Sequence, residues 1–305
     1  MAQIELFETA DCHRGPYSAP VLKSALQKAV RRNRPDLAAS CLKSLVLADV
    51  RAATRRLPVI LIEDAVLHPA QDRMTELMTA AGRKAGLTVE RAEWLMRVAA
   101  ATAALDVRDA PTRIHPLRGS PVGVLGRLST REAALVRALL HRASAGGMAD
   151  DRAMLRDFAG IWFQRFVSRE WSIDRLEALW SRAWAEAQRF IWESVAPAGP
   201  ESILPQAIDF HCAPVIGWLL AKPEVHRLVS ELFPRRSPEG VLRASIWRTR
   251  AGLSVKTMIG FDRPLMWERD FPLHWGDGTD EKVKRIGATI APHLDAYAER
   301  MTRIT

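Results

Sequence analysis

The sequence predicts an all-α protein, folded as a multi-helix globular bundle in two lobes, and three observations support this prediction. Of the 305 residues, 48% are hydrophobic and 26% are charged, a balance that allows a substantial buried core. Apolar residues recur every three to four positions over most of the chain, which is the spacing of amphipathic helices. Near 250–275, β-branched residues and Gly252 replace this spacing, so we expect a short extended segment there.

The N-terminal lobe, residues 1–110, is expected to be helical. In its first helix, apolar residues such as Leu22 and Leu26 share one face, while Lys28, Arg31 and Arg32 form a basic edge. Pro58 is expected to kink or restart the third helix, and Thr88 is expected to cap the fifth. The five helices are predicted at 21–33, 36–48, 50–66, 70–86 and 88–107.

Residues 111–128 are predicted to form an irregular central loop or domain boundary, because the stretch 108–128 contains three prolines and three glycines. The C-terminal lobe, residues 129–305, resumes the helical pattern. Six of the ten tryptophans lie between Trp162 and Trp218, and we expect most of them to be buried in the core. The helices of this lobe are predicted at 129–145, 149–168, 172–195 and about 280–302.

The charge balance favours a polyanionic partner. Lys and Arg total 44 against 35 for Asp and Glu, giving a net charge of +9, and nucleic acid is the commonest partner of such a basic protein. The competing explanation is a high-GC genome, which enriches arginine and alanine without any functional meaning. The N-terminus lacks a basic stretch followed by an apolar one, and no window is apolar enough to span a membrane, so we expect a cytoplasmic protein.

Several common catalytic motifs are absent from the sequence. It has no GxxxxGK[ST], GxGxxG, GxSxG or HExxH pattern, which argues against ATP hydrolysis, nicotinamide chemistry and zinc chemistry. The three cysteines are far apart and form no CxxC pair, so a zinc site or a disulfide framework is not expected. We therefore expect no metal and no organic cofactor.

Two adjacent carboxylates end the apolar run RRLPVILIEDAVLHPA, residues 55–70. If the run is buried, Glu63 and Asp64 emerge where it meets the surface or a cleft. Burial would raise the pKa of at least one of them, whereas Arg55 and Arg56 would lower it. Two interpretations stay open: a catalytic carboxylate pair, or residues that cap the next helix or pair with an arginine.

The segment AIDFHCAP places Asp209 and His211 on either side of Phe210 in a proline-flanked stretch. In a turn of this kind both side chains can point into one pocket, where Asp209 would serve as a catalytic carboxylate and His211 would orient a water molecule. The competing interpretation is that Asp209 caps the following helix and His211 is a buried core histidine.

Basic side chains in several segments are candidates for DNA contact. The stretch SIWRTRAG alternates Trp247 with Arg248 and Arg250, so guanidinium groups can bind phosphates while the indole stacks on an unpaired base. A core tryptophan beside solvated arginines would give the same pattern. The other candidates for phosphate contact are Lys28, Arg31, Arg32, Arg55, Arg56 and Lys256, although charge runs are also found on solvated helix faces.

The stretch SALQKAVRRNRPDLAASCLKSLVLADVRAATRRLPVILIEDAVLHP, residues 24–69, resembles the helical C-terminal region of replication-associated AAA ATPases of the MgsA/RarA type. A basic helix, a Pro-Asp helix start, an Arg-Arg pair and an acidic pair occur in the same order. Because the ATPase module is missing here, the resemblance implies a DNA-associated helical scaffold without nucleotide hydrolysis.

The whole chain resembles antiphage DNA glycosylases that act on glucosylated hydroxymethylcytosine, on the basis of its size, its helical pattern and the stretches IEDAVLHP, DFHCAP and SIWRTRAG. This resemblance implies an enzyme that flips out a modified base of phage DNA and excises it to leave an abasic site. A carboxylate from Glu63, Asp64 or Asp209 would stabilise the oxocarbenium-like sugar. Lys28 or Lys256 would be needed if a Schiff base formed and the strand were also cut.

A second class of function is the alternative to the enzyme. The chain can be a non-catalytic DNA-binding or replication-adaptor protein that uses the region 24–69 to dock or self-associate. A regulator that binds RNA instead of DNA is a third possibility, which the sequence does not separate from the other two.

Overall fold

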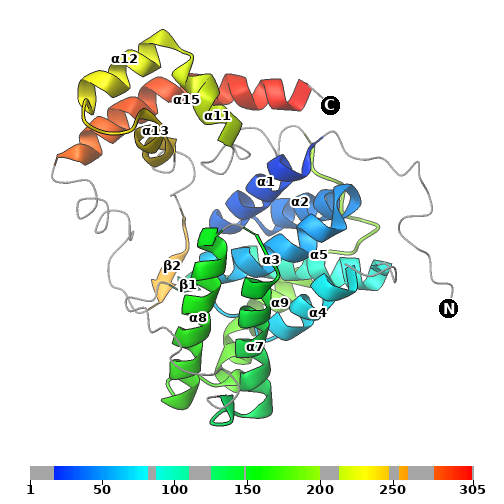
Figure 1. The fold of residues 1–305 in the computed structure, drawn as a ribbon. Coiled ribbons are helices and arrows are strands. Elements are labelled where there is room, and N and C mark those ends of the chain that lie inside the picture. The colour runs from blue at the N-terminus through cyan, green and yellow to red at the C-terminus, as the bar shows by residue number, and fades with distance from the viewer. Residues whose placement is uncertain are drawn as a thin grey trace.

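The computed structural model describes residues 17–81, 87–109, 125–147, 149–199, 213–246, 254–259 and 278–303. Within these ranges the chain forms twelve α-helices and one pair of three-residue strands (Figure 1). The all-α prediction is therefore confirmed. Among these helices, none combines the length and the apolar character that crossing a membrane requires.

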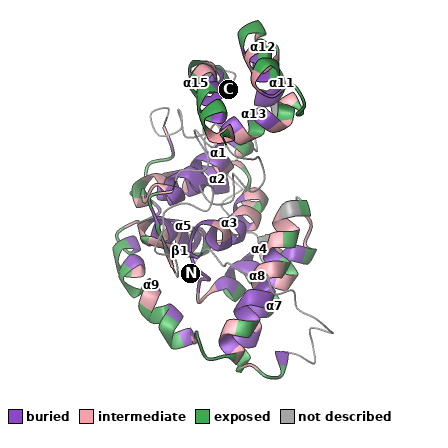
Figure 2. Cartoon of the chain, turned by 90° about the vertical axis from the view of Figure 1, so that its left-hand side faces the viewer, coloured by how far each residue is buried: buried purple, intermediate pink, exposed green. Residues whose placement is uncertain are grey.

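Eight helices share the larger of two hydrophobic cores, which contains buried residues from Tyr17 to Ala198. The central helices of this group are buried on most sides, whereas α9 alternates buried and exposed faces (Figure 2). The helices are α1 (Ala19–Arg31), α2 (Pro35–Ala48), α3 (Val50–Asp64), α4 (Gln71–Ala81), α5 (Val89–Ala104), α7 (Thr130–Ser144), α8 (Ala149–Val167) and α9 (Ile173–Ala187).

The other four helices enclose a separate, smaller core with buried residues from Val215 to Ala298. They are α11 (Ala213–Leu220), α12 (Pro223–Leu232), α13 (Pro238–Ile246) and α15 (Thr279–Arg303), which lie together at the top of Figure 1. The two cores group the helices differently from the lobes expected from the sequence, because α7, α8 and α9 share a core with the N-terminal helices.

A short parallel strand pair joins two distant parts of the chain. Strand β1 (Val107–Asp109) pairs with β2 (Thr257–Ile259), with Val107 opposite Thr257. The extended segment expected near 250–275 contains β2, whereas β1 was expected to be helix end and loop. The backbone N–H of Asp109 also donates to the carbonyl of Ala65, 2.7 Å away, so the pair is attached to the end of α3.

Four of the twelve described helices, α3, α5, α7 and α9, begin at a side-chain cap. The side chains of Asp49, Thr88 and Ser129 each accept a hydrogen bond from a backbone N–H in the first turn of the following helix, and Ser129 forms a full capping box with Glu132. The cap predicted at Thr88 is thus confirmed.

The structure excludes one of the two alternatives at Pro58, and one predicted helix boundary was wrong. Helix α3 does not restart at Pro58; it continues through the proline to Asp64, and the side chains from Leu57 to Ile62 are all buried in the core. This burial offsets the single backbone hydrogen bond that proline removes. Helix α9 ends at Ala187 rather than near 195, and hydrogen-bonded turns follow, one of them between the N–H of Phe190 and the carbonyl of Ala187.

Candidate functional site

The two carboxylates at the end of α3 point in different directions. Asp64 is fully buried, and its two oxygens accept hydrogen bonds from Arg31 Nε at 2.6 Å and from Gln27 Nε2 at 2.8 Å. Glu63 has a side chain that is 23% exposed, and its oxygens lie 3.0 Å from Arg31 Nη2 and 3.6 Å from Arg56 Nη2. We call Gln27, Arg31, Arg56, Glu63 and Asp64 the charge cluster.

The two carboxyl groups of the charge cluster have pKa values shifted in opposite directions. Burial, followed by the neighbouring Asp64 charge, raises the pKa of Glu63 above its ordinary value despite Arg31 and Arg56. Burial alone would also raise the pKa of Asp64, but Arg31 and Arg108 outweigh it, and the pKa lies below its ordinary value. Asp64 is therefore the carboxyl group that loses its proton more readily, and Glu63 is the one that holds a proton more readily.

Lys256, which immediately precedes β2, is buried beside the charge cluster. Its side chain is 5% exposed and its ammonium donates to the carbonyl of Thr102 in α5. Burial is the main cause that lowers the pKa of Lys256 to about 7, against the opposing influence of Asp64. An amine with a pKa near neutrality can act as a nucleophile or a base, whereas an ordinary lysine is fully protonated.

The basic edge expected on the first helix is largely inside the protein. Lys28 is 1% exposed and Arg31 is 6% exposed, because this face of α1 packs against α2, α3 and α5. Arg31 belongs there for a physical reason: a fully buried Asp64 needs a cation and hydrogen bonds. Of the three candidates on this edge, Arg32 alone is half-buried rather than buried.

Arg55 and Arg56 both bind protein groups rather than lying free on the surface. Arg55 Nη2 donates to the carbonyl of Ala145 at 2.8 Å, which attaches α3 to the turn after α7. Arg56 joins the charge cluster to α8 through Asp151, 3.3 Å away. Of the other predicted site residues, Asp209, His211, Trp247, Arg248 and Arg250 lie outside the described residues.

The structure thus brings together Arg31, Arg56, Glu63, Asp64 and Lys256, which come from three segments of the sequence. Among the residues that the structure describes, no group of three or more His, Cys, Asp or Glu side chains has a metal-binding arrangement. The side chains brought together here are two carboxylates, an amine and two arginines.

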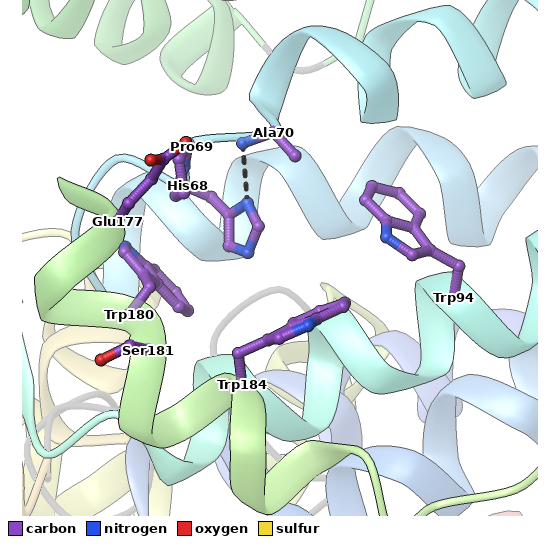
Figure 3. Close-up of a pocket in the computed structure, with 8 residues that line it drawn as sticks. All are labelled: His68, Pro69, Ala70, Trp94, Glu177, Trp180, Ser181 and Trp184. Atoms are coloured by element: carbon purple, nitrogen blue, oxygen red, sulfur yellow. Dashed lines mark hydrogen bonds between the residues drawn. The ribbon is translucent and has the colours of Figure 1, made fainter. Parts of the chain in front are cut away.

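A second feature, which we call the aromatic pocket, lies between α9 and the segments that carry His68 and Trp94 (Figure 3). Its volume is about 270 Å³. Trp180 and Trp184 lie on α9, and Trp94 lies on α5 across the cavity. The described residues that line it are His68, Pro69, Ala70, Trp94, Glu177, Trp180, Ser181 and Trp184.

His68 presents a polar atom to this apolar cavity. Its Nδ1 accepts a hydrogen bond from the backbone N–H of Ala70 at 3.0 Å, and burial lowers the pKa of His68 to about 3. The neutral imidazole therefore carries its proton on Nε2. Figure 3 shows Nε2 turned toward the open centre of the pocket, and no described residue accepts a hydrogen bond from it.

Sequence reasoning missed this pocket because it assigned most tryptophans to the core. A partial signal was present: Trp180 and Trp184 are four residues apart, so they share one face of a helix. Nothing in the sequence indicated that His68 and Trp94 would meet that face.

No protein-family model, no curated protein and no solved structure matches the chain.

Proposed function

We propose that this protein binds DNA and excises a modified base by hydrolysing the N-glycosidic bond, leaving an abasic site. The observation that carries the proposal is the charge cluster together with Lys256. Glu63, with a raised pKa, adjoins Asp64, with a lowered pKa, and the buried amine of Lys256 also has a lowered pKa. Titratable groups with opposite pKa shifts in one place are typical of sites for acid–base chemistry.

Glu63 is the proposed acid, because it combines a raised pKa with a partly exposed side chain. As the C1′–N bond breaks, the departing base takes the bonding electrons and a proton from Glu63. Water then attacks C1′ of the oxocarbenium-like sugar and returns a proton to the carboxylate. Asp64 is a positioning residue: it is fully buried and holds Arg31, which in turn contacts Glu63. Asp209 and His211 remain proposed members of the site.

The proposed substrate is glucosylated hydroxymethylcytosine in phage DNA, and the proposed role is antiphage defence in the cytoplasm. The support for this substrate is the sequence resemblance, together with the net charge of +9, which favours a polyanionic partner. The proposed chemistry uses water and side chains, and it requires no metal or organic cofactor.

The test is release of a base from glucosylated phage DNA, followed by alkali to break the strand at abasic sites. The wild type should produce breaks in glucosylated DNA and none in unmodified DNA. Glu63→Gln should reduce the rate by a factor of roughly 100 or more, because it removes the proton donor. Asp36→Asn, which changes an exposed ion pair with Arg34, should leave the rate unchanged. If glucosylated and unmodified DNA both remain intact, the proposal is wrong.

Reduction with borohydride separates hydrolysis from amine catalysis at Lys256. If the amine attacks C1′, the base leaves and an iminium links lysine to the sugar, and borohydride converts this link into a stable amine. The hydrolytic mechanism predicts base release without a trapped protein–DNA adduct. An adduct that forms in the wild type and is lost in Lys256→Met would assign the attack to Lys256.

A second candidate function is a non-catalytic DNA-binding or replication-adaptor protein. The observation that favours it is the complete pairing of Asp64 inside the fold, which is also typical of structural ion networks. This candidate predicts salt-sensitive DNA binding without any released base, and self-association in gel filtration. The base-release assay described above distinguishes it from the enzyme.

A further inference from the structure

The aromatic pocket has the composition of a site for a flat, uncharged ring. Three indoles and one imidazole surround it, and the hydroxyl of Ser181 is already used by its own helix, donating to the carbonyl of Ala178 at 2.8 Å. Glu177 is also engaged, since its carboxylate lies 2.6 Å from Arg131 Nη2. Among the described lining residues, the side-chain donors left for a ligand are His68 Nε2 and the indole N–H groups of Trp94 and Trp184, and His68 Nε2 is the one turned toward the centre of the pocket.

The rings are held in place by the protein. Trp180 Nε1 donates to the carbonyl of Leu67 at 3.2 Å, and the Trp180 ring meets His68 at 4.5 Å between centroids with an angle of 63°. Trp184 meets His68 at 6.2 Å and 65°. These spacings leave no room for a ring between them, so the free space lies between this group and Trp94 (Figure 3).

We propose that the aromatic pocket binds one unstacked nucleobase, with an indole against its face and His68 Nε2–H donating to an acceptor on its edge. Every base has a π-face for stacking on an aromatic side chain and in-plane acceptor atoms. The inference goes beyond base excision, because the pocket shares no residue with the charge cluster, and it rests on the proposed function only in taking DNA as the partner.

The size of the pocket and the charges at its mouth support this ligand. Pockets for drug-sized molecules hold roughly 300–1,000 Å³, so 270 Å³ suits a single base whose sugar and phosphate stay outside. Arg73 is exposed with its guanidinium 4.2 Å from the Trp94 ring centroid, and it forms no ion pair with any described residue. Arg131 pairs with Glu177, which lines the pocket. Both arginines can contact flanking phosphates.

A quaternary ammonium ion is the other kind of ligand that aromatic cages bind. The pocket disfavours it, because Nε2–H turns the positive end of a dipole toward the cavity and the carboxylate of Glu177 is already paired with Arg131. Competition between the two ligand classes is therefore part of the test.

The experiment measures the affinity of the full chain for a fluorescein-labelled oligothymidine and for the matching duplex by fluorescence anisotropy. Trp184→Leu should weaken oligothymidine binding roughly tenfold, since it removes one stacking surface for a base, and should leave duplex binding within about twofold. His68→Asn retains an acceptor for the Ala70 N–H but loses Nε2, and should weaken oligothymidine binding roughly threefold to tenfold. Trp218→Leu, at a half-buried tryptophan packed against the smaller core, is the control and should change neither affinity.

Thymidine monophosphate should displace the oligothymidine from the wild type, and tetramethylammonium chloride should act no differently from sodium chloride. The inference would be overturned if Trp184→Leu lost oligothymidine and duplex binding equally, or if both pocket variants bound oligothymidine as the wild type does. Displacement of the oligothymidine by tetramethylammonium but not by thymidine monophosphate would also overturn it. If Trp184→Leu does not fold, the oligothymidine affinity of His68→Asn and the competition experiment test the inference in its place.

The base-release assay keeps this inference separate from the proposed function. A single-strand preference that is lost in Trp184→Leu, combined with no base release by the wild type, supports the pocket and rejects excision. If the wild type releases a base but the pocket variants bind oligothymidine with unchanged affinity, excision is supported and the role of the pocket is rejected.

Discussion

Replacing Lys256 with methionine tests how strongly the fold disfavours a buried ammonium. Lys256 is 5% exposed, and its pKa is lowered to about 7 chiefly because burial penalises the charged form. In the unfolded chain the pKa returns to its ordinary 10.5. Between about pH 7 and pH 10.5 the unfolded protein therefore binds more protons than the folded protein, and Lys256 makes stability rise with pH across this window.

The magnitude follows from the two pKa values. A fall from 10.5 to about 7 corresponds to about 5 kcal/mol at about 1.4 kcal/mol per pKa unit. About 3 kcal/mol of this penalty is relieved between pH 7 and about pH 9.5. Methionine does not titrate. The free energy of unfolding of Lys256→Met, measured relative to that of the wild type, should therefore fall by about 3 kcal/mol over the same pH interval.

Urea denaturation followed by circular dichroism at both pH values measures this difference. Lys282→Met, which removes an exposed lysine of α15, is the control and should show no comparable pH dependence relative to the wild type. Parallel stability curves for the wild type and Lys256→Met from pH 7 to about pH 9.5 would refute the reasoning, because they would mean that the amine keeps an ordinary pKa in the folded protein.

Three further substitutions test the packing that supports the two sites. Asp64→Asn should destabilise the fold by about 3–5 kcal/mol because Arg31 loses its buried partner. Asp36→Asn, in an exposed ion pair, should destabilise it by less than about 1 kcal/mol. Equal losses of stability in thermal melts of the two variants would contradict this prediction. Gln71→Leu should stabilise the protein by about 1–3 kcal/mol, because the side-chain Nε2 and Oε1 of Gln71 are buried without a hydrogen-bond partner. A melting temperature below that of the wild type would contradict this prediction. Ser129→Ala should cost about 1 kcal/mol by removing the capping box of α7; an unchanged urea midpoint would show that the cap contributes nothing.

The helices could be predicted because their signals are local. The spacing of apolar residues and caps such as Thr88 are contained within a few positions of the sequence. Strand β1 could not be predicted in this way, since it has three residues and its partner β2 lies about 150 positions further along the chain. A pair of this kind is determined by tertiary contacts, and no periodicity can develop over three residues.

The charge cluster was predictable in part. The adjacent carboxylates stood out, and one of the two interpretations kept open for them was pairing with an arginine, which the structure shows for Asp64 and Arg31. The sequence did not indicate whether the basic face of α1 points to solvent or into the core. A basic edge looks the same whether it faces solvent or a buried carboxylate 33 positions away, so Lys28 and Arg31 were placed on the surface.

The chain between the two sites is fixed at almost every residue. Asp64 binds Arg31, the carbonyl of Ala65 accepts from the N–H of Asp109, the carbonyl of Leu67 accepts from Trp180, and Nδ1 of His68 accepts from Ala70. Turning the imidazole would break the Nδ1 hydrogen bond and the contact with the Trp180 ring, so Nε2–H already points into the aromatic pocket before any ligand arrives. Because a preorganised donor requires little ordering on binding, the contacts made by a bound ring contribute more of their energy to affinity.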